Sequence, residues 1–259
     1  VSLYPASGGS VSGVVTYTWS LEGVFDSNPN AWWRFTKSTG LLELGTDGGT
    51  SGNKFVYETA GGSGDNELPW RKVITNYTTV IKKVATTGHF QVGDADHLTS
   101  MANWFKDHTK LHTFDGTGLN TRYVTSFQSL FDGATKLATV TFADASGATE
   151  WNTANVTSMA YMFRNCSTLT GLPTLSIFDT SSVMTFMGMF QGAAGLQYAT
   201  GISGWNTTKV TSFDYMFTDC KALRTLDFTN WDMVSGASDK VAGVTRTSAA
   251  TALDFLKGC

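Results

Sequence analysis

The chain has 259 residues, of which 41% are hydrophobic and 15% are charged, a composition typical of a folded globular protein rather than a disordered one. The formal net charge is −3, and the 18 Lys and Arg residues are spread along the chain, so we expect no nucleic-acid partner. No apolar run approaches the ~20 residues that cross a bilayer, and residues 1–30 lack the basic start and apolar block of a signal peptide. The first residue is Val rather than Met, and we therefore expect a piece of a longer protein or a processed chain.

Residues 1–85 are expected to form a β-rich N-terminal cap. Short apolar and aromatic runs alternate here with clusters of Gly, Ser and Asn, a pattern typical of strands and turns. The expected strands cover residues 14–21, 32–35, 41–44 and 54–57. Residues 73–84 are predicted to be a further strand, which leads into the repeats.

Residues 86–259 carry an internal repeat. One eight-residue phrase, such as Val-Thr-Ser-Phe-Asp-Tyr-Met-Phe at 210–217, recurs at 124–131, 156–163 and 183–190, with a weaker copy at 98–105. The final Phe of each copy follows the previous one after 26, 32, 27 and 27 residues. A period of this length indicates a solenoid, whose units bury their apolar faces against one another. The expected coils are 97–118, 119–150, 151–177, 178–204, 205–230 and a degenerate coil at 231–259.

Each coil is predicted to contain one helix and one strand. Val210, Phe213, Met216 and Phe217 have the spacing of one helical face, and the hydroxyls of neighbouring threonines are expected to cap that helix. These threonines are Thr207, Thr208 and Thr211. Leu226 and Phe228 then alternate with polar residues, as in a short strand. The fold class is therefore α/β, a solenoid of about five to six helix-strand coils with a β-rich N-terminal cap.

The predicted strands place threonine-rich positions on the outside of the sheet. We call this set the sheet face, and it consists of Thr113, Asp115, Thr139, Thr141, Tyr198, Thr200, Thr225 and Asp227. Such a regular array can bind an extended ligand. The alternative is that threonine occurs here only because it has a high strand propensity on a solvated face. A second candidate binding element is an insertion at residues 143–150, represented by Asp144, Ser146 and Glu150. Aromatic Trp151, Trp205 and Trp231 recur at the bend before the phrase, where their rings are expected to stack between coils.

The cysteines and histidines favour structural roles. Cys166 and Cys220 occupy the same repeat position two coils apart, roughly 10 Å at strand spacing, which is too far for a disulfide. Cys259 is expected one coil beyond Cys220, at a distance that leaves a bridge between them open. His108 takes the cysteine position in the first coil and need not share a face with His112, so we expect no metal site. The sequence has no catalytic motif, and we expect no cofactor and no enzymatic activity.

The segment from Trp151 to Leu172 resembles the repeat of bacterial surface proteins with BspA-type leucine-rich repeats, and the similarity extends over residues 97–228. The resemblance implies a leucine-rich-repeat-like, secreted or cell-surface solenoid that adheres to host cells, matrix protein or polysaccharide. Its partners would be an extracellular protein or a cell-surface glycan, without membrane insertion of this segment. One alternative is a receptor-binding or decoration domain of a virion, such as a phage tail fibre. Another is a carbohydrate-active enzyme, which would need clustered carboxylates in a cleft.

Overall fold

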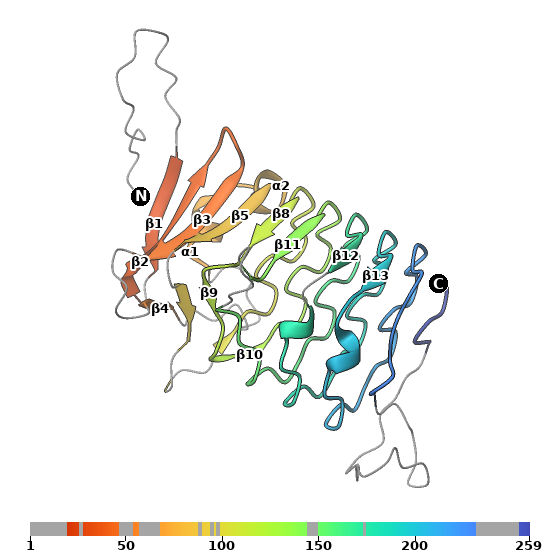
Figure 1. Ribbon diagram of the computed structural model, residues 1–259. Helices are drawn as coiled ribbons and strands as arrows, with labels where there is room; N and C mark the ends of the chain where they lie inside the picture. The colour runs from red at the N-terminus through yellow and green to blue at the C-terminus, as the bar shows by residue number, and fades with distance from the viewer. Residues whose placement is uncertain are drawn as a thin grey trace.

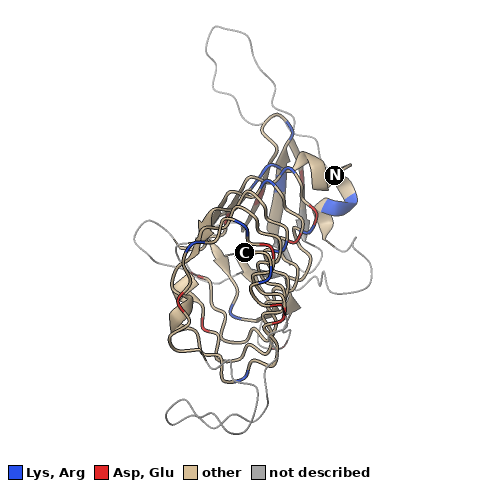
Figure 2. Ribbon diagram, turned by 90° about the vertical axis from the view of Figure 1, so that its right-hand side faces the viewer, with Lys and Arg blue, Asp and Glu red and all other residues tan. Residues whose placement is uncertain are grey.

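The chain winds into a β-solenoid, in which successive coils stack from an N-terminal sheet towards the C-terminus (Figure 1). The computed structural model describes residues 20–25, 28–46, 54–56, 68–87, 90–93, 96, 99–143, 150–172, 175–231 and 254–259. Viewed from the C-terminal end, the coils superpose and the charged residues are distributed around their outline (Figure 2). The stacked-repeat architecture expected from the sequence period is therefore confirmed.

One mixed sheet continues from the N-terminal segment into the first coils, in the order β1-β2-β3-β5-β8-β11. Its strands are β1 (Ser20–Phe25), β2 (Asn28–Thr36), β3 (Leu41–Thr46), β5 (Lys83–Thr87), β8 (Thr113–Asp115) and β11 (Thr139–Thr141). The pairs β1-β2 and β2-β3 are antiparallel, whereas β3, β5, β8 and β11 run parallel. The N-terminal strands thus cover the first coil by extending its own sheet.

Three smaller sheets complete the coils, and one of them, β12-β13, continues the row of β8 and β11 on the same side (Figure 1). They are β4-β6-β9, β10-β7 and β12-β13, and the two later coils contribute β12 and β13. The bounds are β4 (Lys54–Val56), β6 (Phe90–Val92), β7 (Thr99–Ser100), β9 (Leu119–Asn120), β10 (Val124–Ser126), β12 (Gly171–Leu172) and β13 (Tyr198–Ala199). All of these pairings are parallel, as expected where one coil lies directly on the next.

The predicted strand at 73–84 is largely wrong. The segment forms two short helices, α1 (Pro69–Val73) and α2 (Tyr77–Val80), and only its last residues enter β5. Pro69 at the first turn favours helix initiation because its missing amide needs no partner there. Asn76 adopts a left-handed conformation (φ 56°) and separates the two helices. The other described helices are 3₁₀ turns, η1 (Leu175–Ile177) and η2 (Ile202–Gly204).

The helix predicted in every coil is also wrong. The phrase instead forms consecutive turns, in which the residues two before and two after the final Phe have positive φ, as at Tyr161 (59°) and Asn165 (60°). A right-handed helix cannot contain such residues at this frequency. Consecutive turns reproduce the helical spacing of the apolar side chains, and this is why the sequence pattern was misleading.

The backbone amides of the phrase explain why the turns prevail. Alternate amides bond within the coil, as Leu130 N–H does to the Phe127 carbonyl (3.1 Å). The amides between them bond to the next coil, as Ser129 N–H does to Ala160 and Phe131 N–H to Met162 (both 2.9 Å). An isolated two-turn helix is marginal in water, whereas a stacked neighbour offers a carbonyl to every second amide.

Of the threonines expected to cap a helix, Thr208 donates its hydroxyl to Asn206 Oδ1 within its own turn (2.7 Å), whereas Thr211 and threonines at the Thr207 position of other coils connect coils. The Thr153 hydroxyl donates to the Asp179 carbonyl (2.7 Å) and the Thr180 hydroxyl to the Asn206 carbonyl (3.0 Å), each in the next coil. Thr211 donates in the opposite direction, to the Met184 carbonyl of the preceding coil (3.0 Å). These bonds satisfy buried polar groups and fix the register of the stack.

Two columns of aromatic rings run through the core. The final Phe residues of the phrase stack at centroid distances of 5.8, 5.5, 5.7 and 5.2 Å along Phe105, Phe131, Phe163, Phe190 and Phe217. The predicted tryptophan column is confirmed, with a phenylalanine in the coil that lacks Trp, along Trp151, Phe178, Trp205 and Trp231. Each of the three Trp rings also donates its N–H to a backbone carbonyl that lies 29 to 35 residues earlier in the chain. Aromatic pairs of this kind contribute about 0.5–1.5 kcal/mol beyond their area burial.

All three cysteines are free thiols, and no disulfide joins Cys220 to Cys259. Each thiol donates to the carbonyl of the Phe one coil before it, and for Cys259 that residue is Phe217 (2.9 Å). Cys259 therefore lies one coil beyond Cys220, as its sequence position predicts. Residues 254–259 resume the coil pattern, because Phe217 N–H bonds to the Phe255 carbonyl (3.0 Å). Residues 232–253 of the degenerate coil lie outside the described residues.

Candidate functional site

The structure places the predicted sheet face along the parallel strands, in two rows. Thr113 pairs with Thr139, and Asp115 with Thr141, across β8 and β11. Tyr198 of β13 pairs with Thr225 through a single β-bridge, and Thr200 and Asp227 follow two residues later. Thr113, Asp115 and Thr141 are half-buried, whereas the other five residues of the sheet face are exposed. The strand register inferred from the repeats thus places the polar positions in rows across neighbouring coils.

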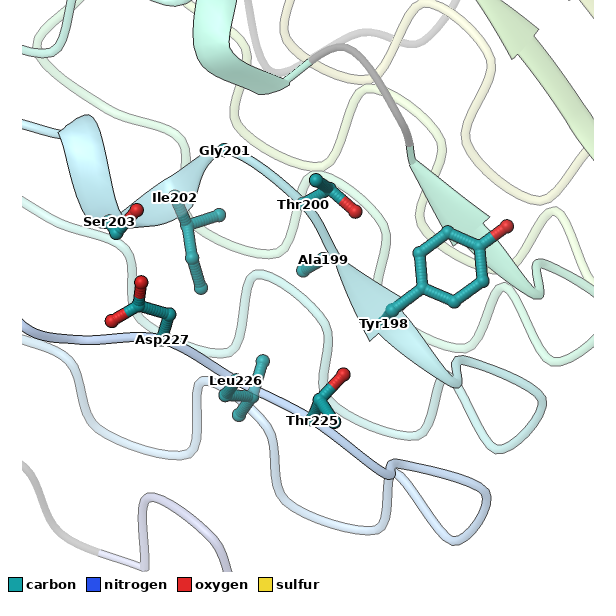
Figure 3. A pocket seen from close by; sticks show the side chains of 9 residues that line it. All are labelled: Tyr198, Ala199, Thr200, Gly201, Ile202, Ser203, Thr225, Leu226 and Asp227. Atoms are coloured by element: carbon teal, nitrogen blue, oxygen red, sulfur yellow. The ribbon is translucent and has the colours of Figure 1, made fainter.

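Four residues of the sheet face come together around one hollow of about 260 Å³ (Figure 3). We call it the sheet-face hollow, and it is lined by Tyr198, Ala199, Thr200, Gly201, Ile202, Ser203, Thr225, Leu226 and Asp227. The remaining four residues of the sheet face lie in other coils, on β8 and β11, and do not line it. The hollow is thus a local feature of the two coils that follow β12.

The hollow exists because two neighbouring segments separate after one bridge. β8 and β11 pair over three residues, whereas the strand pairing between the later segments is limited to the Tyr198–Thr225 bridge. Gly201 (φ 90°) then bends its strand into η2, and an added Cβ there would lie 2.7 Å from the Ser176 amide nitrogen. The coils meet again where Asn230 Nδ2 donates to the Ser203 carbonyl (3.1 Å).

Tyr198 forms one wall of the hollow. Its ring lies over Gly171, its register partner on β12, so closely that an added Cβ on Gly171 would overlap three ring atoms. Figure 3 shows the ring face-on above this strand. The side chain remains 43% exposed, so one face rests on the backbone of β12 and the other faces solvent. Sequence reasoning missed Gly171, although an isolated glycine within a strand indicates the close approach of another group.

Asp227 supplies the negative charge of the hollow. Its Oδ1 accepts hydrogen bonds from the hydroxyl of Thr229 and from the Thr229 backbone amide (3.0 Å). These bonds, the hydroxyl contribution being the larger, lower the pKa of the carboxyl below its ordinary value. The group is therefore an oriented anion at neutral pH, fixed in place by its own turn.

The predicted binding loop is described only at its end. Asp144 and Ser146 lie outside the described residues. Glu150 is half-buried, and its Oε2 accepts a hydrogen bond from Nδ2 of Asn120, which lies 30 residues earlier in the chain, at the start of the same repeat (3.1 Å). This contact gives Glu150 a structural role.

His108 is the strongly perturbed histidine of the first coil. It is fully buried, and its Nδ1 lies 3.0 Å from the Lys106 carbonyl oxygen. Burial lowers the pKa of the imidazole to about 4, so the ring is neutral. His112 is exposed, and the described residues contain no group of three or more His, Cys, Asp or Glu that could hold a metal ion.

The stacked parallel strands and the exposed sheet face define a repeat protein of the solenoid class. One family model matches two overlapping parts of the chain, residues 76–142 and 137–251, and its description is Mycoplasma protein of unknown function, DUF285. The chain belongs to this family. Searches of curated proteins and of solved structures gave no match. Among the described helices, none has the length and apolar character that a bilayer crossing requires.

Proposed function

We propose that the chain is a non-enzymatic recognition module, secreted or displayed on a cell surface, that binds an extracellular protein or glycan through its sheet face. The observation that carries this proposal is the sheet-face hollow, in which Tyr198, Thr200, Thr225 and Asp227 converge around about 260 Å³. Binding sites combine such a concave surface with a few placed polar groups. The resemblance to BspA-type repeats supports the same function, adhesion.

The chemistry of the hollow favours binding over glycoside hydrolysis. Hydrolysis canonically uses two carboxyl groups about 5–9.5 Å apart. Asp227 is the one carboxylate among the residues that line the hollow. The carbohydrate-active enzyme is therefore the weaker alternative.

Binding arrays of glycans and matrix proteins test the proposal directly. The blocking variant is Thr139→Lys/Thr225→Lys, because both side chains are exposed on the sheet face. The matched control is Gln128→Lys/Met184→Lys, which adds the same charge at exposed positions within the repeated phrase. We expect the unmodified chain and the control to bind the same targets, and the blocking variant to lose them.

Two results would contradict this function. Equal binding by the blocking variant would move the contact away from the sheet face. Binding of no target by any of the three proteins would favour a spacer or a virion decoration domain.

A further inference from the structure

The sheet-face hollow combines one flat apolar surface with several hydrogen-bonding groups. The free face of Tyr198 is fixed in orientation because the other face rests on Gly171. The corresponding strand positions in other coils hold Thr113, Thr139 and Thr225, so the ring replaces a hydroxyl at this point of the row. A rigid ring of this kind presents contact area at little conformational cost.

Hydrogen-bonding groups stand on one side of that ring. Thr200 follows Tyr198 along the same segment, while Thr225 and Asp227 belong to the next coil. Two hydroxyls can donate or accept, and the Asp227 carboxylate accepts only. The residues that line the hollow include no Lys or Arg, so they provide no counter-charge for an anionic ligand.

We propose that the sheet-face hollow binds a neutral pyranose sugar, stacked on Tyr198 and hydrogen-bonded by Thr200 and Thr225, with Asp227 at the far end of the hollow open to the hydroxyls of an adjoining ring. This inference rests on the proposed recognition function and names its ligand class. A pyranose presents a face of C–H groups, which packs on an aromatic ring, and a rim of hydroxyls, which donate to a carboxylate and exchange hydrogen bonds with threonine. The charge of Asp227 disfavours acidic sugars by repulsion.

The size of the hollow sets the extent of the ligand. Its volume of about 260 Å³ lies below the ~300–1,000 Å³ of typical small-molecule pockets. One sugar ring fills such a site, and further rings of a glycan would extend along the exposed sheet face. A single ring with few contacts is expected to bind with a Kd on the order of millimolar.

Saturation-transfer NMR on the full chain tests this site with defined probes. The probes are methyl β-D-glucopyranoside, methyl β-D-galactopyranoside and the methyl glycoside of N-acetylneuraminic acid. We expect saturation of at least one neutral glycoside, strongest at the C–H protons of one ring face, and none for the acidic sugar. Absence of saturation for both neutral glycosides, or equal saturation of the acidic sugar, would overturn the proposal.

Variants at Tyr198 and Gly171 assign the signal to the stacking surface. Tyr198→Phe keeps the ring and should bind within about threefold of the unmodified chain, whereas Tyr198→Thr should weaken binding at least tenfold. Gly171→Thr should do the same without removing the ring, because its new side chain displaces Tyr198. Thr is the residue at this position in other coils, so the strand accepts it, and thermal unfolding verifies the fold of each variant.

A control away from the sheet face is Gln128→Ala, at an exposed position of the repeated phrase, which should bind unchanged. Unaltered sugar binding in Tyr198→Thr would overturn the site. The binding arrays of glycans and matrix proteins distinguish failure of the pyranose site from failure of the proposed recognition function. Binding of a matrix protein by both the unmodified chain and Tyr198→Thr, without sugar binding, would refute the pyranose site and leave the recognition module standing.

Discussion

Acid should destabilise this protein through His108, whose imidazole is buried between aromatic rings in the first coil. The ring centroids of Tyr77 and Phe105 lie 5.4 and 5.6 Å from the imidazole. Its Nε2 has no hydrogen-bond partner among the described residues, and the nearby Arg71 guanidinium adds to the effect of burial in lowering the pKa to about 4. A proton on this ring would therefore be a buried, poorly solvated charge.

The sign and size of the effect follow from proton linkage. The pKa is about 4 in the folded state and 6.5 in the unfolded state, so the unfolded chain binds more protons below pH 6.5. The stability associated with the neutral ring is fully present above pH 6.5 and is lost as the pH falls through 4. At pH 4 the unfolding free energy is lower by about 3 kcal/mol than above pH 6.5 because of this group. This loss is a large part of a typical unfolding free energy of about 5–15 kcal/mol.

Urea unfolding followed by tryptophan fluorescence measures this loss between pH 7.5 and pH 4. The comparison protein is His108→Cys, because cysteine occupies the same position at Cys166 and Cys220. The lost packing of the smaller side chain costs the same stability at every pH, but the loss of stability on acidification should be about 3 kcal/mol less than in the unmodified chain. An identical pH dependence in the two proteins would refute the assignment to His108.

Three further predictions concern the stack. Phe190→Ala should lower the unfolding free energy by about 3–5 kcal/mol in urea titrations, because the ring is fully buried between two stacked rings; a loss below 1 kcal/mol would contradict the column. Gly192→Ala should cost at least about 1–2 kcal/mol in the same assay, since φ is 70° and the new Cβ would meet Asn165; a neutral substitution would rule out this turn. A thiol reagent should label Cys259 in the native protein and the two buried cysteines only after unfolding, because burial raises their pKa values; rapid native labelling of all three would be incompatible with the fold.

The repeat period predicted the solenoid because it depends on inter-coil packing, which the sequence records directly. The spacing of Val210, Phe213 and Phe217 identified the buried side chains correctly but not their backbone conformation, since helices and consecutive turns share that spacing. A decisive signal was present two residues after each final Phe. Asp, Gly and Asn recur there, the residues that most readily adopt positive φ, at Asp107, Gly133, Asn165, Gly192 and Asp219.

The candidate site was predicted as a row of residues but not as a hollow. Strand alternation placed Tyr198, Thr200, Thr225 and Asp227 outward, and those four line the hollow. Its concavity depends on where two segments stop pairing after the Tyr198–Thr225 bridge. The end of this pairing is set by the bend at Gly201. A consensus taken over all repeats does not show a residue that is particular to one coil.

In each coil, alternate backbone amides of the repeated phrase bond within the coil and to the next coil. This arrangement also determines how the protein resists a pulling force. A load that pulls the outermost coil away from the stack acts along the inter-coil bonds of that coil alone, so coils should peel off singly. Each peeling event frees one repeat of 26–32 residues, which at ~3.3–3.6 Å per extended residue lengthens the chain by roughly 9–11 nm. A molecule anchored at one end and held by a ligand on its sheet face would therefore yield in steps, and the coils between anchor and ligand would serve as an extensible tether.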